Sequence, residues 1–438
     1  MTQDEAIEIM KMGYNVFLTG EAGTGKTYVL NRYIEFLRKK KIAVSVTAST
    51  GIAATHIDGV TLDSWSGLGI RDEIGEKELR ELMYKHHLVK RIRNTKVLII
   101  DEVSMIHGGR FDATDKILRF IRNSDQPFGG VQVILSGDLF QLPPVSNNRN
   151  NIDFIFKSGA WKDLDLRYCY LLAPKRQSDE KFLRLLNEIR HSEITESTYE
   201  LLSERMYEGD GEKNSYTKLY THNIDVDSIN QRELDRIGSE ERRFFMSSVG
   251  PDKVVEAMKR NCLSPGELVL KKGAFVMFVR NNYEKGYVNG SLGEVLGFDS
   301  NGDPTVKMIN GHKITVTPAS WSVVEDEKIV AQITQVPLRL AWAITVHKSQ
   351  GMTLDRAEMD LSKSFVPGMG YVALSRVRDL SGIRLLGINQ MALTVNPEIS
   401  EIDKYLLSLS SETSENLKKM GLLKKIMKKR EFMYKLTS

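Results

Sequence analysis

Two kinds of hydrophobic pattern alternate along the first third of the chain. Mainly apolar runs of strand length occur at residues 16–18, 43–48, 97–100 and 131–135. Runs of this kind, with little polar alternation, predict parallel strands that are covered on both faces. After the first run the apolar residues recur at three- and four-residue steps, which predicts a helix that buries Val29, Leu30, Tyr33, Ile34 and Leu37.

The first of these strands leads directly into the sequence Gly-Glu-Ala-Gly-Thr-Gly-Lys-Thr at residues 20–27. Glycines let a backbone wrap closely around a phosphate, and the N-terminus of the following helix favours an anion. In this strand–loop–helix context, Lys26 is expected to reach the β- and γ-phosphates, and the Thr27 hydroxyl is expected to join the coordination of Mg²⁺. The segment therefore predicts a phosphate-binding loop for a nucleoside triphosphate.

Two later strands end in residues suited to the same chemistry. The strand at 97–100 ends in Asp101 and Glu102, which are candidates for holding Mg²⁺ and for polarising the attacking water. The strand at 131–135 is followed by Gly137 and Asp138, and then by Gln141, a candidate sensor of the γ-phosphate. A loop glutamine without function remains the alternative for Gln141.

Other segments indicate contacts with a base or with nucleic acid. Residues 2–12 predict a short amphipathic helix, where Gln3 stands near the place of an adenine-reading glutamine in nucleotide-dependent motors; a solvated surface glutamine is the alternative. Residues 61–67 place hydroxyl groups beside Trp65, a combination that grips a sugar-phosphate and stacks a base. A partly buried core position is the alternative for Trp65. Residues 218–223 resemble a strand that ends in polar residues.

The second half of the chain changes character. Glycines punctuate short alternating segments between residues 262 and 330, and Asn-Gly pairs at 301–302 and 310–311 are hairpin signals, which together predict a small β-barrel or meander. The C-terminal segment from Asn416 onward is amphipathic and rich in lysine. It suits a nucleic acid or an acidic partner, and a solvated terminal helix is the other interpretation.

Bulk composition narrows the class of protein. The 438 residues are 41% hydrophobic and 27% charged, which is typical of a soluble globular protein of two to four domains. The net charge of +4 permits a nucleic-acid partner without requiring one. Only Cys169 and Cys262 are cysteines, so no disulfide framework or zinc site is predicted. With no membrane-spanning apolar run and no signal pattern, we expect a cytoplasmic, nucleoid-associated protein.

The ordered set of motifs resembles the superfamily-one helicases of the RecD-like branch, and within it the Pif-one family. The segment Phe111–Gln132, with Pro127–Gly130, is similar to that family's own signature, and Asn289–Gly293 is similar to one of its late motifs. Around Arg176 the chain has Ala-Pro-Lys-Arg-Gln where the family usually has a hydrophobic and aromatic lead-in. The other matching segments are Gly20–Thr27, Thr47–Ala54, Asp101–Met105, Gly137–Pro144, Thr345–Gly351 and Tyr371–Arg378.

The resemblance implies an α/β fold with two RecA-like P-loop NTPase domains and a small inserted β-barrel domain. The first RecA-like domain is expected at residues 1–150, with a small wedge insertion near 65–90. The second is expected at 171–261 and 331–400, the inserted barrel at 262–330, and a basic helical tail at 401–438.

The resemblance also implies a set of site residues. ATP would be bound by Gln3, Gly20, Glu21, Ala22, Gly23, Thr24, Gly25, Lys26, Thr27, Gln141, Gly351 and Arg376. Mg²⁺ would be held by Thr27 and Asp101. Catalysis would involve Lys26, Glu102 and Gln141, with Arg176 and Arg376 as arginine fingers from the second domain. Single-stranded DNA would lie near Thr50, Ser64, Trp65, His222, Asn223, His347 and Lys348.

The function implied by the resemblance is that of an ATP-dependent DNA helicase. The family moves five-prime to three-prime on single-stranded DNA, and forked DNA, G-quadruplexes and RNA–DNA hybrids are candidate substrates in DNA replication, repair, recombination or telomere-like maintenance. A monomer is expected in solution, with dimerisation on DNA left open. The alternatives are a nucleotide-switched clamp or remodeller that binds single-stranded DNA without unwinding, and, less favoured, a P-loop kinase.

Overall fold

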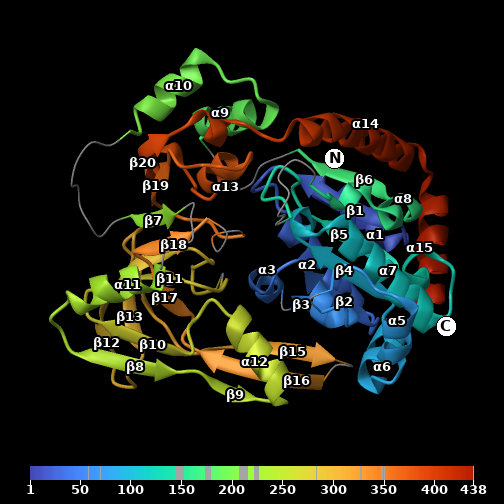
Figure 1. The fold of residues 1–438 in the computed structure, drawn as a ribbon, viewed down its shortest axis with the longest axis horizontal. Coiled ribbons are helices and arrows are strands. Elements are labelled where there is room, and N and C mark those ends of the chain that lie inside the picture. The colour runs from blue at the N-terminus through green and yellow to red at the C-terminus, as the bar shows by residue number, and fades with distance from the viewer. Residues whose placement is uncertain are drawn as a thin grey trace. The chain divides into compact units, whose positions relative to one another are not determined.

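The computed structural model consists of two compact units joined by the chain (Figure 1). Unit 1 is Met1–Arg176 together with Pro397–Ser438, and unit 2 is Gln177–Asn396. The chain therefore leaves unit 1, forms unit 2 and returns to unit 1. The structure describes residues 1–438 except 58, 70, 145–151, 173–178, 207–215, 221–225, 283, 326–327, 347–348, 350 and 438.

Unit 1 contains a six-stranded sheet in which every neighbouring pair of strands is parallel, in the order β3-β2-β4-β5-β1-β6. All residues of β1, β4 and β5 are buried, which confirms the prediction of strands covered on both faces. The strands are β1 Val16–Gly20, β2 Val44–Ala48, β3 Val60–Thr61, β4 Val97–Asp101, β5 Gln132–Ser136 and β6 Arg167–Leu171.

Two helices of unit 1 lie where the sequence predicted helices. Helix α2 (Lys26–Lys39) begins directly after Gly25 and buries the five predicted residues Val29, Leu30, Tyr33, Ile34 and Leu37. Helix α1 (Gln3–Lys11) begins with a capping box in which Thr2 and Glu5 satisfy each other's backbone N–H groups. The other helices of the N-terminal part are α3 Gly51–His56, α4 Leu62–Ser66, α5 Glu76–Met83, α6 His86–Asn94, α7 Gly108–Arg122 and α8 Gly159–Asp163.

The segment Phe111–Gln132, which resembles a family signature, is a structural support between β4 and β5. Buried Phe128 has a left-handed backbone (φ 51°) and its ring centroid lies 5.0 Å from that of Phe111. The Asp115 carboxylate holds this turn, because it accepts from the Phe128 N–H at 2.5 Å and pairs with Arg119 at 2.7 Å. The signature therefore fixes the loop that leads into β5.

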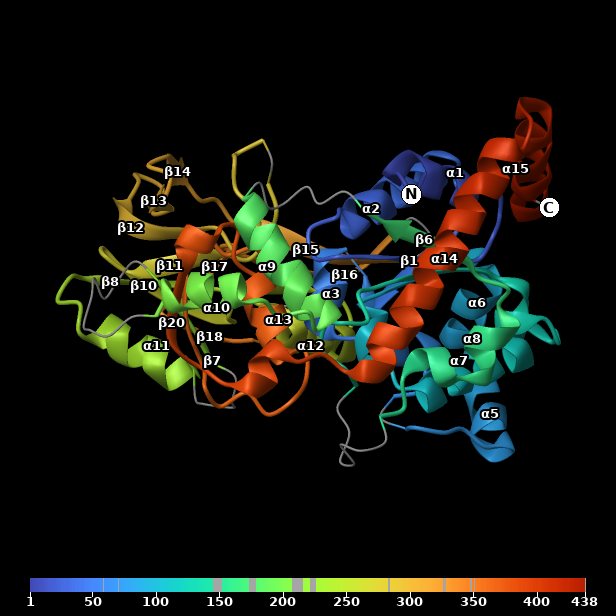
Figure 2. The same cartoon turned by 90° about the horizontal axis from the view of Figure 1, so that it is seen from above.

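The C-terminal segment of the chain packs on unit 1 as two helices, α14 (Pro397–Lys419) and α15 (Leu422–Thr437). Helix α14 lies along β6, where the Tyr170 hydroxyl donates to Asp403 at 3.1 Å and the Tyr170 N–H donates to Ser410 Oγ at 2.9 Å. Helix α15 lies beside α1 (Figure 2). The basic C-terminal segment is thus helical, and its Leu417, Phe432 and Leu436 are buried in the core of unit 1, so the segment is not a wholly solvated terminal helix.

Unit 2 contains a second parallel sheet, of four strands in the order β18-β7-β19-β20. Together with unit 1 it agrees with the expected α/β fold. The strands are β7 Thr217–Tyr220, β18 Ala343–Thr345, β19 Ala357–Leu361 and β20 Ile383–Ile388, and the accompanying helices are α9 Glu180–His191, α10 Glu196–Ser203, α11 Val226–Asp235 and α13 Met369–Ser375.

The glycine-rich part of unit 2 is antiparallel. Both Asn-Gly signals are confirmed as hairpin turns, since Gly302 (φ 86°) lies between β12 and β13 and Gly311 (φ 88°) between β13 and β14. The closed barrel remains a prediction. The elements are β8 Glu241–Phe245, β9 Ser247–Val249, α12 Asp252–Asn261, β10 Glu267–Lys271, β11 Phe275–Phe278, β12 Leu292–Phe298, β13 Pro304–Met308, β14 Lys313–Thr315, β15 Ala319–Glu325, β16 Lys328–Gln335 and β17 Leu338–Leu340.

Candidate nucleotide and nucleic-acid sites

The loop after β1 has a backbone that only glycine accommodates well. Gly20, Gly23 and Gly25 have φ angles of 142°, 85° and 89°. A Cβ atom at Gly20 would lie 2.5 Å from the carbonyl oxygen of Leu171. The loop therefore presents bare backbone immediately before the N-terminus of α2, as a phosphate-binding site requires.

The side chain of Lys26 folds over this loop. Its Nζ donates to the carbonyl oxygens of Gly20 at 2.8 Å and Glu21 at 3.0 Å, and Thr24 Oγ1 donates to the same Glu21 oxygen at 2.9 Å. The positive charge thus lies within the loop, next to the backbone that would surround a phosphate. This position suits the phosphate contact that the sequence predicted.

Asp101 ends β4, and Glu102 directly after it has an unusual backbone conformation. Burial raises the pKa of the Asp101 carboxyl group, while the Glu102 N–H, at 2.9 Å, and the Lys26 ammonium favour its charged form. Glu102 adopts the left-handed region (φ 52°, ψ 45°), which costs a non-glycine residue on the order of 1–3 kcal/mol. Strain of this kind is often found at functional sites, and the amino-acid sequence alone did not indicate it.

Gln141 follows the neighbouring strand β5 and is buried. Its N–H donates to the Asp138 carbonyl oxygen at 3.0 Å. Gly137 allows a close approach here, because a Cβ atom would lie 3.0 Å from the backbone nitrogen of Val103. Since β4, β5 and β1 are parallel neighbours, the structure brings the loop, the two acids and Gln141 to one edge of the sheet.

Gln3 contacts the loop directly. Its Nε2 donates to the Thr24 carbonyl oxygen at 3.0 Å. A Cβ atom at Gly25 would lie 2.3 Å from the same nitrogen. The side chain is therefore fixed against the loop, and its role in contacting the base remains a prediction.

The candidate DNA contacts of unit 1 have different surroundings. Thr50 caps α3 by accepting from the Ala53 N–H at 3.2 Å, and Ser64 is exposed. Trp65 is only 2% exposed, so it occupies a core position, which was the alternative interpretation of its place in the sequence. Base stacking on Trp65 would require the indole to leave its packing. Arg176, His222, Asn223, His347 and Lys348 lie outside the described residues.

The late motifs meet inside unit 2. A Cβ atom at Gly290 (φ 95°) would lie 2.3 Å from the Thr353 carbonyl oxygen, and the Thr353 N–H donates to Asn289 O at 3.3 Å. The Leu354 N–H in turn donates to the Arg376 carbonyl oxygen at 2.8 Å. Gly351, the expected nucleotide contact, lies just before Thr353 in the chain and has a φ of 78°.

Arg376 is 1% exposed at the end of α13. Its Nε donates to the Val372 carbonyl oxygen at 3.0 Å and its guanidinium donates to Ser375 Oγ at 3.1 Å. Arg190 of α9, which the sequence analysis missed, is also buried and donates to the Tyr371 hydroxyl at 3.1 Å. In the sequence, Arg190 stands directly after Ile189, on the apolar face of the predicted helix. This position was the signal that could have indicated a buried arginine.

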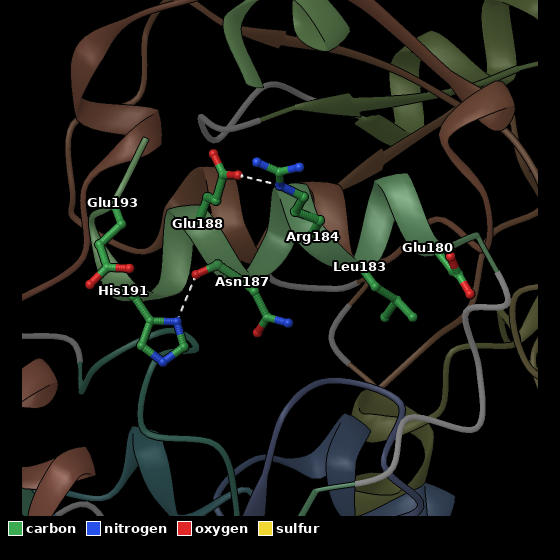
Figure 3. Close-up of a pocket in the computed structure, with 7 residues that line it drawn as sticks. All are labelled: Glu180, Leu183, Arg184, Asn187, Glu188, His191 and Glu193. Atoms are coloured by element: carbon green, nitrogen blue, oxygen red, sulfur yellow. Dashed lines mark hydrogen bonds and ion pairs between the residues drawn. The ribbon is translucent and has the colours of Figure 1, made fainter. Parts of the chain in front are cut away.

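One face of α9 lines a shallow cavity of about 470 Å³ (Figure 3). Glu188 is the organising residue, since it accepts from Arg184 at 2.9 Å and from the Thr195 hydroxyl at 2.7 Å. Although partial burial acts in the opposite direction, hydrogen bonds from Thr198, Thr195 and Arg184 lower the pKa of Glu188 to about 2. Within the described ranges no group of three His, Cys, Asp or Glu residues is placed to hold a metal ion. The cavity is lined by residues of α9 and by Glu193, which follows this helix.

None of the described helices combines the length and the apolar character that crossing a membrane requires.

Comparison with known families and relatives gives consistent matches. The model of PIF1-like helicases matches residues 3–200, and the model of the DNA helicase Pif1 2B domain matches residues 253–298. The ATP-dependent DNA helicase Pif1 of Psychrobacter sp. is 41% identical, over 95% of this chain and 72% of that protein.

Solved structures show the same similarity. The crystal structure of Bacteroides sp. Pif1 in complex with ADP-AlF4 is 32% identical, with a TM-score of 0.78 over 93% of this chain and 96% of that one. A Bacteroides Pif1 structure with ADP-AlF3 and single-stranded DNA is 34% identical, with a TM-score of 0.62 over 94% of this chain and 97% of that one.

Proposed function

The chain belongs to the PIF1-like helicase family and is an ATP-dependent DNA helicase, and from this premise we propose that it moves five-prime to three-prime along single-stranded DNA and unwinds duplex DNA. The observation that carries the proposal is the sheet edge of unit 1, where Lys26, Asp101, Glu102 and Gln141 follow three neighbouring strands. The Bacteroides Pif1 structure that contains ADP-AlF3 and single-stranded DNA supports a DNA strand as the partner.

We propose that ATP is bound with Mg²⁺ at the loop of residues 20–27. Gly20 and Gly25 keep the loop backbone bare and closely packed, because a Cβ atom there would collide with Leu171 O or Gln3 Nε2, and Lys26 supplies a cation next to the loop. The Thr27 hydroxyl and the Asp101 carboxylate are oxygen ligands of the kind that Mg²⁺ prefers, so the residues present fit this ion. Bound Mg²⁺ supplies positive charge that offsets the charge on the phosphates.

Catalysis is assigned to residues of both units. Glu102 orients and polarises the attacking water, and Gln141 senses the γ-phosphate from the end of β5. Arg376, and Arg176 by resemblance, would neutralise the charge that develops in the transition state. Lys26 belongs to unit 1 and Arg376 to unit 2. By the family resemblance, ATP turnover that uses residues of both units would drive movement along DNA.

The finer functional assignments rest on the family resemblance. We propose forked DNA as a substrate, with G-quadruplexes and RNA–DNA hybrids as further ones, and a role in DNA repair or recombination. We also propose Thr50, Ser64 and Trp65 of unit 1, together with His222, Asn223, His347 and Lys348, as contacts to the DNA strand. Such contacts to phosphates and bases would make binding weaken as salt rises.

The proposed function is tested by measuring ATP turnover with and without a single-stranded oligonucleotide, in the presence of Mg²⁺. A motor that hydrolyses ATP on its track is expected to turn over several times faster when DNA is added. Hydrolysis that is indifferent to single-stranded DNA would contradict the proposal. A duplex without single-stranded tails serves as the matched control, and it should stimulate hydrolysis less.

A further inference from the structure

The C-terminal helix α15 holds the helix that carries Gln3. Phe432 of α15 is 8% exposed and covers Gly13, the residue shortly after the end of α1. A Cβ atom at Gly13 would lie 2.4 Å from Phe432 Cδ2, so a glycine there (φ 86°) lets the ring pack directly on the backbone. Leu436, one turn further along α15, is buried in the same hydrophobic core.

Polar contacts fix the same pair of helices. Glu8 of α1 pairs with Lys429 at 2.8 Å and with Lys425 at 3.6 Å. Lys428 donates to the Tyr14 hydroxyl at 2.6 Å and lies 4.6 Å from the centroid of that ring. Partly exposed ion pairs stabilise little by themselves, so the packing of Phe432 on Gly13 is the main contact that α15 makes near α1.

The other end of α1 lies on the nucleotide loop. Gln3 stands in the first turn and donates to the Thr24 carbonyl oxygen at 3.0 Å. Helix α1 has nine residues, a length of about 14 Å at 1.5 Å per residue. Helix α1 also buries Ala6, Ile7, Ile9 and Met10, and Asp4 beside Gln3 pairs with Arg32 at 2.7 Å. The contacts with α15 near the C-terminal end of α1 are therefore one of several constraints on where Gln3 lies.

We propose that α15 is a positioning element for nucleotide recognition, which holds α1 so that Gln3 meets the base of ATP. Phe432, Lys425 and Lys429 are positioning residues, because they contact Gly13 after α1 and Glu8 within it, and not the loop of residues 20–27. The inference rests on the proposed function, since it takes the loop of residues 20–27 as the ATP site. It gives α15 a role in affinity for ATP and in preference for the adenine base.

The opposite face of α15 provides matched controls. Leu423 and Met427 are 78% and 69% exposed, so alanine at either position removes apolar surface from the same helix without touching α1. A replacement of Phe432 should act on nucleotide recognition, and a replacement of Met427 should not. This contrast separates a positioning effect from a general effect on α15.

The central experiment measures DNA-stimulated hydrolysis of ATP and of GTP by Phe432→Ala. We expect KM for ATP to rise roughly 3- to 10-fold, the effect of losing one hydrogen bond, while kcat at saturating ATP changes little. The ratio of kcat/KM for ATP to that for GTP should fall by a similar factor. Phe432→Leu, which keeps an apolar side chain over Gly13, should recover most of the loss, and Met427→Ala should match the unmodified protein.

A double-mutant comparison tests whether the effect passes through Gln3. Gln3→Ala should raise KM and lower the ATP preference, and adding Phe432→Ala to Gln3→Ala should change neither value further. Additive effects, or an unchanged KM in Phe432→Ala with a folded protein, would overturn the inference. If Phe432→Ala lowers the melting temperature below the assay temperature, Glu8→Gln removes both ion pairs with little change in volume and takes its place.

The outcomes also separate this inference from the proposed function. If Gln3→Ala leaves KM and the ATP preference unchanged, Gln3 does not contact the base, and the inference fails while ATP-driven unwinding stands. If no variant and not even the unmodified protein hydrolyses ATP, the proposed function itself fails. A KM effect in Gln3→Ala that Phe432→Ala does not reproduce overturns only the role of α15.

Discussion

Replacement of Lys26 with alanine is expected to abolish ATP hydrolysis and DNA unwinding while leaving much of the binding to single-stranded DNA. The Lys26 ammonium donates to the loop carbonyls of Gly20 and Glu21, where it supplies a cation next to the backbone of the proposed phosphate-binding loop. Loss of one such preorganised group costs about 10²–10³ in turnover in well-studied sites. Phosphate release and the fluorescence anisotropy of a labelled oligonucleotide measure the two properties.

Lys39→Ala is the matched control for this prediction. Lys39 lies in the last turn of the same helix, α2, and forms only an exposed pair with Glu35. The control should therefore keep normal turnover. Turnover of Lys26→Ala within a few-fold of the unmodified protein would show that the loop at residues 20–27 is not the site of hydrolysis.

The second large effect is expected at Arg376. Arg376→Ala should lower kcat for ATP by roughly 10³-fold or more, the usual contribution of an arginine finger, with a much smaller change in nucleotide affinity. Arg376→Lys keeps a charge but loses the planar fork, so it should recover only part of the rate. The rate of phosphate release at saturating ATP gives kcat, and a separate binding measurement gives the nucleotide affinity.

Because Arg376 is buried, the variant must also be tested for correct folding. The guanidinium is buried and bonded to Val372 O and Ser375 Oγ, so its removal also affects packing at the end of α13. Melting curves distinguish a catalytic loss from unfolding, and Lys363→Ala, at an exposed position of unit 2, serves as a neutral variant. A folded Arg376→Ala protein with normal kcat would exclude this residue from catalysis.

Local patterns are sufficient to predict the strands of unit 1 and the phosphate-binding loop. The apolar run at 97–100 and the mainly apolar run at 131–135 have no helical spacing, and the glycines at 20, 23 and 25 leave few other conformations. The parallel order of the strands then places their C-terminal ends together. For this reason the motifs alone assign Lys26, Asp101 and Gln141 correctly to the ends of neighbouring strands.

The remaining features depend on contacts between distant residues. The left-handed backbone of Glu102 and the burial of Trp65 follow from tertiary packing, which composition and spacing do not encode locally. The same holds for Phe432, which meets Gly13 only because the chain returns to unit 1 after unit 2. From its sequence, the lysine-rich helix α15 could be solvated, bind nucleic acid or pack on protein. Only the structure shows that one face of α15 packs beside α1.

The central claim is that ATP hydrolysis by this protein separates DNA strands, and unwinding of tailed duplexes tests it most directly. A duplex with a five-prime single-stranded tail is compared with the same duplex carrying a three-prime tail, both with ATP and Mg²⁺. The account predicts strand displacement from the five-prime-tailed substrate and little from the other. DNA-stimulated hydrolysis without displacement from either substrate would contradict it and would identify the protein as a nucleotide-switched clamp.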